Sequence, residues 1–458
     1  MSLYTCRKWL ALLALGPVLL LAASAAGAQA VGVVEFARGV GFAQTPGQVP
    51  RTLGKGLNLK EGDRLTTADG GSAIIKLDDG TRMTLRPNSE MVLQTYRFKE
   101  NAPDNSMLMQ LVRGGFRAVT GLISKNAPDA AKIRTNTSTI GIRGTDFDAR
   151  VCTGECGAES SLVQENARPS AIFASAKVVT SQGEVSAVDS AGVQRRLVDG
   201  GSVYPGDVIE TRQDALAVLA FRDETRITLG KETRFRVDNF LFDSQNAGEG
   251  RFLATILKGT VRVLTGLIGK ANIQNVGFDT VTAKIEVRGT GFDIVCRGSC
   301  AQQETGEENS GLTLFAWQGS IAVTPTGSTT LQVLNVGQGM FFSPSGIRPV
   351  SSQPSITVPR PDSVVIPPKL FTSTSVADDS EGLFVFVRDG HIEIATAGEV
   401  LHLGRGETGF AGNNGVTARP ILMPKFIEFD KMPLPTSRNP MLVSVLADLG
   451  IKPTNQCK

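Results

Sequence analysis

Residues 140–148 read Ile140-Gly141-Ile142-Arg143-Gly144-Thr145-Asp146-Phe147-Asp148, and the pattern returns at 285–293 as Ile285-Glu286-Val287-Arg288-Gly289-Thr290-Gly291-Phe292-Asp293. In both places a Cys-x-x-x-Cys pair follows, first Cys152 with Cys156 and then Cys296 with Cys300. The two stretches start at 140 and 285, a separation far beyond the roughly 20–50 residues of solenoid repeats. The spacing therefore indicates a duplicated domain.

The similarity extends upstream of these stretches. Residues 62–98 align without a gap to residues 206–242, and the shared positions include Gly62-Asp63 with Gly206-Asp207, Asp79 with Asp223, Thr81-Arg82 with Thr225-Arg226, and Thr84-Leu85 with Thr228-Leu229. Ala73, Ile75 and Leu77 fall on one face of a strand-like run with a period of two, which is typical of a half-buried antiparallel hairpin. Glu224 stands where the first copy has Gly80, so we expect the hairpin turn to need no positive φ there.

Composition favours an all-β protein. The 458 residues include 50 glycines, and short strand-like runs separated by turns outnumber helical patterns. The formal charge of +3 gives no electrostatic reason to expect nucleic acid or an anionic membrane as a partner. We expect two tandem antiparallel, strand-rich domains of sandwich or solenoid-like form, and a small C-terminal β unit.

Residues 1–30 have the pattern of a secretory signal peptide. Arg7 and Lys8 precede an apolar run, and Ala28-Gln29-Ala30 offers a small-x-small cleavage site before Val31. A membrane anchor is the alternative, but the apolar run is short for a spanning helix. We expect a periplasmic or secreted protein with no transmembrane segment after cleavage.

The cysteines agree with export. In an oxidising compartment a close pair favours a disulfide, and cysteines flanking a three-residue hairpin loop stand within disulfide range. The alternatives are a zinc site, for which neither pair has a nearby histidine, and a redox motif, which is normally one residue shorter. Cys457 remains as a free or intermolecular thiol.

The second half of the chain contains two further related segments. Strand-like residues 311–342 are echoed by residues 382–411, and seven prolines mark residues 344–368 as an extended linker or strap. The expected division is a signal peptide (1–30), domain 1 (31–160), a linker (161–172), domain 2 with its closing unit (173–345), a Pro-rich linker (346–381), a small β unit (382–423) and a Pro-containing tail (424–458) in which residues 440–450 could form a short helix.

The order of these motifs resembles that of the FecR domain family. Gly62-Asp63, Asp79-Gly80-Thr81, Arg113-Gly114 and Arg143-Gly144-Thr145-Asp146-Phe147 carry the resemblance, as do their second-copy counterparts. It implies an all-β periplasmic module that relays signals between an outer-membrane transporter and an anti-sigma factor. The chain differs from that pattern because the domain is doubled and no anti-sigma segment or transmembrane helix is evident.

We find no catalytic, metal or cofactor constellation. Residues 404–409 match a dinucleotide pattern by letter but lack the helix that must follow. Asp146 and Asp148 could pair on a metal, yet Gly291 replaces the first in the second copy. His391 and His402 could lie on neighbouring strands, but without a third ligand we expect solvated strand residues.

The shared motif residues are expected to be structural. An arginine on an apolar strand must keep its charge solvated or paired, so we expect Arg143 and Arg288 to pair with Asp63 or Asp79 and with Asp207 or Asp223. Gly144-Thr145 and Gly289-Thr290 would belong to the same structural motif. The alternative is that both arginines are exposed and contact a partner.

The sequence thus predicts a non-enzymatic module for protein–protein contacts in envelope sensing or signal regulation. The partner would be an envelope protein of unknown identity, with no cofactor and no evident small-molecule substrate. A structural envelope or surface scaffold is the alternative, and a hydrolase with an unrecognised site is a third hypothesis.

Overall fold

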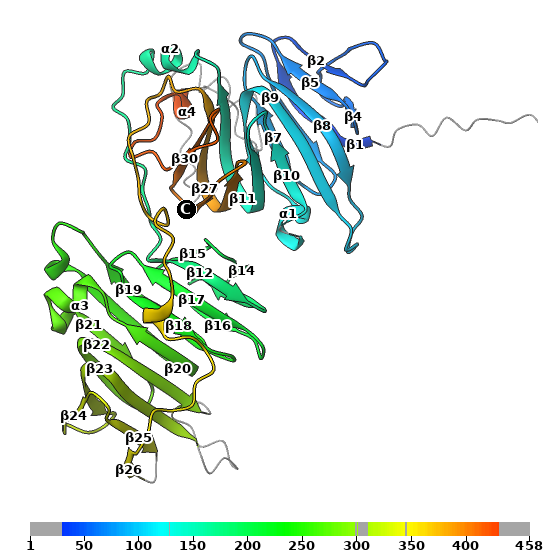
Figure 1. Cartoon of the computed structure of the whole chain (residues 1–458). Helices are drawn as coiled ribbons and strands as arrows, with labels where there is room; N and C mark the ends of the chain where they lie inside the picture. The colour runs from blue at the N-terminus through cyan, green and yellow to red at the C-terminus, as the bar shows by residue number, and fades with distance from the viewer. Residues whose placement is uncertain (1–29, 128, 298–299, 301–309, 344–345, 430–458) are drawn as a thin grey trace, which may run out of the picture.

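The strands form two separate sheets, one for each repeat. The computed structural model describes residues 30–127, 129–297, 300, 310–343 and 346–429 (Figure 1). Strands make up 52% of the structure and helices 7%, which confirms the all-β fold class. Residues 1–29 of the expected signal peptide (1–30), Cys457 and the possible helix at 440–450 lie outside the described residues.

The first sheet has fifteen strands. They are β1 (Ala30–Arg38), β2 (Gly41–Gln44), β3 (Arg51–Thr52), β4 (Asn58–Lys60), β5 (Arg64–Thr67), β6 (Ser72–Leu77), β7 (Arg82–Leu85), β8 (Glu90–Arg97), β9 (Ser106–Val119), β10 (Ala131–Arg134), β11 (Thr139–Cys152), β27 (Gly382–Ala395), β28 (Val400–Leu403), β29 (Thr408–Gly412) and β30 (Thr417–Ala418).

The second sheet has the same number of strands. They are β12 (Ala176–Gln182), β13 (Val185–Val188), β14 (Gln194–Arg196), β15 (Ser202–Val203), β16 (Val208–Thr211), β17 (Leu216–Phe221), β18 (Arg226–Leu229), β19 (Arg234–Leu241), β20 (Arg251–Leu264), β21 (Val276–Asp279), β22 (Ala283–Arg297), β23 (Gly311–Pro325), β24 (Gln332–Asn335), β25 (Gly339–Ser343) and β26 (Gly346–Val350).

Helices are short and lie at turns or edges. They are α1 (Leu122–Asn126), α2 (Cys156–Ser161), α3 (Leu267–Ala271) and α4 (Phe426–Phe429), with 3₁₀ turns η1 (Ala247–Glu249), η2 (Ile273–Asn275) and η3 (Pro361–Ser363).

Both sheets share one topology. The path β5-β8-β9-β10-β11 in the first sheet corresponds to β16-β19-β20-β21-β22 in the second. All pairings are antiparallel except β9 with β10 and β20 with β21. The predicted hairpin is confirmed as β6–β7, in which Ala73, Ile75 and Leu77 are buried in the core of the first sheet. Each sheet encloses its own apolar core.

The two sheets differ in where their closing strand comes from. In the second sheet β22 pairs with β23, the next strand along the chain. In the first sheet β11 pairs over its whole length with β27, which follows the entire second sheet. The expected separate C-terminal unit is thus hydrogen-bonded into the first sheet (Figure 1). Along the sequence, residues 176–350 are inserted between the two segments that make up that sheet.

The turn of the β6–β7 hairpin corrects one expectation. Gly80 has φ +86°, and Glu224 at the equivalent turn adopts φ +69°. The left-handed conformation is therefore kept in both copies, and the second copy tolerates the steric cost of a side chain there. The expectation that this turn needs no positive φ was therefore wrong. The exposed Glu224 adopts the positive φ itself, so its presence did not indicate a different turn.

Gly114 occupies a more crowded position than Gly80. Gly114 has φ +73°, and a Cβ there would lie 2.4 Å from Ser89 Oγ and 2.5 Å from Ser89 Cα. Gly259 meets Thr233 in the same way. We expect Gly114→Ala to lower the free energy of unfolding by about 1–3 kcal/mol through overpacking, beyond the backbone strain of a left-handed alanine, about 1–2 kcal/mol.

Gly80→Ala is the matched control, because a Cβ at Gly80 meets nothing within 4 Å. It should carry the backbone strain alone. Urea denaturation measures both variants, and equal losses would show that the contact with Ser89 is not limiting.

Candidate interaction face

The repeated Arg-Gly-Thr motif forms a bulge where each sheet meets its closing strand. Gly144 and Gly289 have φ +58° and +67°, and the register shifts at these points. Gly390 faces the first bulge so closely that a Cβ would lie 2.3 Å from Gly144 O. The Thr145 hydroxyl donates to His391 O at 3.0 Å, and Thr290 donates to Ser320 O at 2.7 Å. The motif therefore joins the closing strand to the sheet.

The arginines of the motif do not pair as expected. Arg143 lies 3.0 Å from Asp129 and 3.5 Å from Glu393. The Arg288 side chain is exposed and has no partner among the residues that the structure describes. The expected pairs with the turn aspartates are wrong, because those carboxylates are occupied by nearer groups.

Asp63 and Asp207 hold the turn that enters the sheet. Asp63 Oδ2 accepts from Lys60 N at 2.8 Å and from Arg51 Nη2 at 2.5 Å. Asp207 accepts from Tyr204 N at 2.7 Å and pairs with Arg195. Both carboxylates are buried, so each is stabilised by a charged partner and by its own turn.

Asp79 and Asp223 connect the hairpin turn to a short helix. Asp79 accepts from Thr81 N at 3.0 Å and from Thr81 Oγ1 at 2.9 Å. Thr81 Oγ1 in turn accepts from Gly121 N at 2.9 Å, just before α1. Thr225 and Gly266 repeat this arrangement before α3. Burial raises the pKa of Asp223.

The last aspartate of each motif is a buried carboxylate that we did not predict as an ion-pair partner. Asp148 binds Arg117 Nε at 2.8 Å and Arg388 Nε at 2.7 Å. Asp293 binds Arg262 Nε at 2.9 Å and accepts from Trp317 Nε1 at 3.0 Å. The signal was present in the sequence, since arginine precedes this aspartate by the same interval in both copies (117 to 148, 262 to 293).

The Pro-rich segment is a strap, residues 351–372, laid over this side of the second sheet (Figure 1). Arg262 Nη1 donates to Val358 O at 2.9 Å, and Arg226 Nη1 donates to Val364 O at 3.1 Å. Gln353 Nε2 donates to Asp293 Oδ2 at 2.8 Å. Two strand arginines thus bind the backbone of an extended segment.

A cavity lies where the strap passes the second bulge. Its volume is about 250 Å³, and Arg226, Lys270, Glu224 and Asp362 line it. The charges on its wall are mixed, because two are cations and two are anions. Nothing in this lining forms a nucleophile–base pair.

The first sheet presents the same side chains without such a strap. We call Arg82, Arg117, Asp148, Phe386 and Arg388 the first-domain face. Arg82 and Arg117 occupy the positions of Arg226 and Arg262, and Arg388 that of Trp317. Among the described residues, no segment crosses Arg82 and Arg117 as the strap crosses their counterparts. The Arg82 side chain is 40% exposed and pairs with Glu35.

One carboxyl beside this face has an unusual environment. Asp146 lies next to Asp148 and Asp389 on the paired strands β11 and β27. Burial raises the pKa of Asp146, and its Oδ1 has no hydrogen-bond partner among the described residues.

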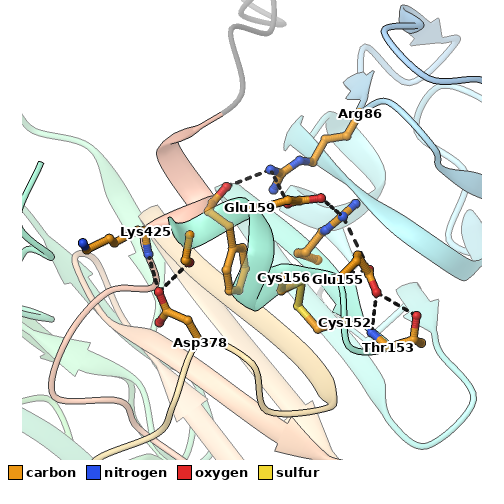
Figure 2. The surroundings of a disulfide bond; sticks show 11 residues. Arg86, Cys152, Thr153, Glu155, Cys156, Glu159, Asp378 and Lys425 are labelled. Carbon is orange, nitrogen blue, oxygen red and sulfur yellow. Dashed lines mark hydrogen bonds and ion pairs between the residues drawn. A yellow bond between two sulfur atoms is a disulfide. The ribbon is translucent and has the colours of Figure 1, made fainter. Parts of the chain in front are cut away.

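The cysteines stand at disulfide separation, with Cα atoms 5.7 Å apart for Cys152 and Cys156 and 5.1 Å for Cys296 and Cys300. The first pair does not close a hairpin as expected, because Cys156 begins α2. Figure 2 shows Arg86 beside Glu159 of α2, with Arg86 Nη2 3.9 Å from Glu159 Oε2. Ser160 of the same helix donates to Asp378, which also accepts from Lys425 N at 3.2 Å. The pair thus fixes the end of β11 against α2 and α4.

Charged and titratable groups are buried where the second sheet meets the closing strands of the first. Lys177 Nζ and Arg419 Nε both lie 2.8 Å from Glu407 Oε2. Lys177 and Glu407 are 0% exposed, and burial lowers the pKa of Lys177 to about 8. We call Lys177, Glu407 and Arg419 the junction triad.

The two histidines lie beside this triad. Their rings stack at 5.4 Å, with His402 Nδ1 3.3 Å from His391 Nε2. Burial lowers the pKa of His402 to about 4 and that of His391 well below its usual value. The expectation of fully solvated strand residues was wrong, because the second sheet packs over β28 and leaves both side chains only partly exposed.

The remaining sequence candidates form no site. Residues 404–409 make a turn into β29, and Gly406 lies against Phe173. Within the described ranges, no group of three potential metal ligands gathers, and no helix there has the length and apolar character to span a membrane.

Comparisons with known proteins identify the repeat. Residues 63–167 and 207–307 match the model of the family described as FecR protein. Two crystal structures, each described as that of "a putative anti-sigma factor from Parabacteroides distasonis ATCC 8503", share 16% identity with this chain, cover 32% of it and 59% of their own length, and give a TM-score of 0.24. No curated protein matches the sequence.

Proposed function

Since the chain carries two FecR domains in tandem, we propose that it is a non-catalytic interaction module that regulates signalling in the bacterial envelope. In this proposal the first-domain face binds an extended segment of another envelope protein. The chain is exported by its N-terminal segment and works in the periplasm or outside it.

One observation carries the proposal. The second FecR domain binds an extended, proline-containing segment through Arg226 and Arg262, which donate to Val364 O and Val358 O. The first domain has arginines at the same two positions. Backbone carbonyls occur in every sequence, so this mode would recognise an extended conformation first, with side-chain contacts supplying specificity.

The chemistry of the first-domain face supports a partner segment different from the strap. Arg388 replaces Trp317, and its guanidinium lies 5.2 Å from the ring of Phe386. Asp146 and Asp389 add two carboxyls beside it. A segment with backbone carbonyls for Arg82 and hydrogen-bond donors for these carboxyls would complement the charges.

A site-specific photo-crosslinker tests this assignment in the native envelope. Placed at Arg82, it should form a covalent product with another envelope protein. At the matched position Arg226 it should react within the chain, with residues 358–364 of the strap. Mass spectrometry of both products gives the crosslinked residues.

Arg82→Ala supplies the energetic check with the identified partner. Losing one charge-assisted hydrogen bond costs about 1.5–3 kcal/mol, which is roughly a tenfold to hundredfold weaker complex. An intramolecular product at both positions would overturn the proposal. A product with wall or outer-membrane structural components would favour the scaffold alternative.

A further inference from the structure

The internal junction is a contact between the end of one repeat and the start of the next. On one side are residues of the β28–β29 turn, and on the other are β12 and β15. His402 fills the space above Gly200, where a Cβ would lie 2.0 Å from His402 Cγ. The guanidinium of Arg405 lies 4.5 Å from the ring of Tyr204, whose hydroxyl accepts from Arg405 N at 2.8 Å.

The second repeat carries an equivalent of the first side of this contact. Because Ile321 pairs with Leu334 as Ile392 pairs with Leu403, Val333 takes the place of His402 and Val336 that of Arg405. Val333 is 43% exposed, Val336 61% and the neighbouring Leu331 45%. We call Leu331, Val333, Val336 and Gln338 the trailing edge.

The first repeat carries an equivalent of the other side. Val33 pairs with Asn58 as Lys177 pairs with Ser202. Val33 therefore matches Lys177, and Gly56 matches Gly200, since each glycine N–H donates to the equivalent valine carbonyl at 2.8 Å. Gly56 and Asn58 are exposed. We call Val33, Gly56, Asn58 and Lys60 the leading edge.

At the positions that match the junction triad, the two edges carry no charge. All three members of the junction triad are replaced by neutral residues at the matching positions: Lys177 by Val33, Glu407 by Gln338 and Arg419 by Pro349. Had only one member been replaced, a contact between the edges would bury an unpaired charge at a cost of several kcal/mol. With all three neutral, the exposed Val333 and Val336 can be buried without leaving a triad charge unpaired.

We propose that the trailing edge of one copy of this chain docks onto the leading edge of a second copy, repeating the internal junction between molecules. The contact joins two different surfaces, so it is heterologous. Such contacts continue head to tail into a filament, or close into a ring where the rotation permits. Self-association of this kind goes beyond binding at the first-domain face and does not depend on it.

Sedimentation of the full chain over a range of concentrations tests the contact. The wild-type chain should pass from monomer to dimer and larger species as concentration rises. Val336→Asp places a charge in the trailing edge, and Asn58→Trp blocks the leading edge with a bulky side chain that strands accommodate. Each variant alone should stop at the monomer and raise the dissociation constant at least about tenfold, or 1.4 kcal/mol.

Mixing the two variants separates this contact from any other. Val336→Asp keeps an intact leading edge and Asn58→Trp an intact trailing edge, so an equal mixture should form a one-to-one dimer and nothing larger. Val365→Asp, at a strap residue that is 86% exposed, should behave as wild type. Far-UV circular dichroism confirms that each variant is folded.

Three results would overturn the proposal. The wild-type chain could remain monomeric at every concentration, the single variants could associate as wild type does, or the mixture could stay monomeric although wild type associates. The second result would assign self-association to a surface other than these two edges.

Discussion

Glu407→Ala should lower the free energy of unfolding by about 3–5 kcal/mol, because it leaves two buried cations without their anion. Lys177 Nζ and Arg419 Nε each lie 2.8 Å from Glu407 Oε2. Lys177 would keep only His402 O, at 3.1 Å, and its pKa, already lowered by burial to about 8, should fall further. Urea denaturation at neutral pH measures the loss.

Two further variants show whether the loss comes from charge. Glu184→Ala breaks an ion pair with Arg212 in which both side chains are more than half exposed, and should cost about 0–1 kcal/mol. Combining Lys177→Val, Glu407→Gln and Arg419→Met removes the whole triad and should recover most of the loss, since an apolar substitute for a buried ion network is often neutral. A loss from Glu407→Ala no larger than that from Glu184→Ala would contradict the argument.

The duplication and the strand character of both repeats could be predicted because they are local or periodic properties. Ala73, Ile75 and Leu77 alternate along a single strand, and the turn that follows is adjacent in sequence. The cysteine spacing likewise needs only a few residues. Interactions of this kind are encoded within one stretch of chain.

The source of the closing strand could not be predicted from such patterns. Residues 382–395 resemble residues 311–324 whether they pair with β11 or form a separate unit. Strand propensity does not specify which strand another strand will pair with. What excludes the separate unit is the unsatisfied edge of β11. Without β27, β11 would leave a long row of backbone groups unpaired beside a buried face.

The burial of polar side chains could not be predicted either. Like the pairing of β11 with β27, it depends on contacts between segments that are far apart in the sequence. His391 and His402 lie on strands with solvent-facing neighbours, and only packing of the second sheet covers them. Asp148 was considered only as a possible metal ligand with Asp146, and neither Asp148 nor Asp293 was predicted as an ion-pair partner, since their arginine partners come from other strands. The regular interval to Arg117 and Arg262 was the one available signal.

The two partly buried histidines predict that the protein loses stability in mild acid. An unfolded histidine has a pKa near 6.5, whereas that of His402 is about 4 in the folded chain and that of His391 is also lowered. Below pH about 6.5 the unfolded state therefore binds more protons than the folded state. Their contribution is complete above about pH 6.5 and is lost as pH falls, on the order of 3 kcal/mol for His402 by pH 4.

Three buried or partly buried aspartates contribute to the pH dependence with the opposite sign. Burial raises the pKa of Asp146, Asp223 and Asp279, so their protonation stabilises the folded state as pH falls. A comparison of variants separates the two effects. His391→Ser with His402→Val introduces the residues that the second repeat carries at the matching positions, Ser320 and Val333.

Wild type and this double variant should differ most in how steeply the free energy of unfolding changes with pH. Between pH 6.5 and 4 the wild-type free energy of unfolding should fall by several kcal/mol more than that of the variant, because each histidine adds up to about 1.4 kcal/mol per pH unit. Lys177, Arg143 and Arg419, which disfavour the protonated ring of His402, are common to both proteins. Parallel pH profiles from urea denaturation would show that the rings are protonated in the folded chain and that the junction does not exclude water from them.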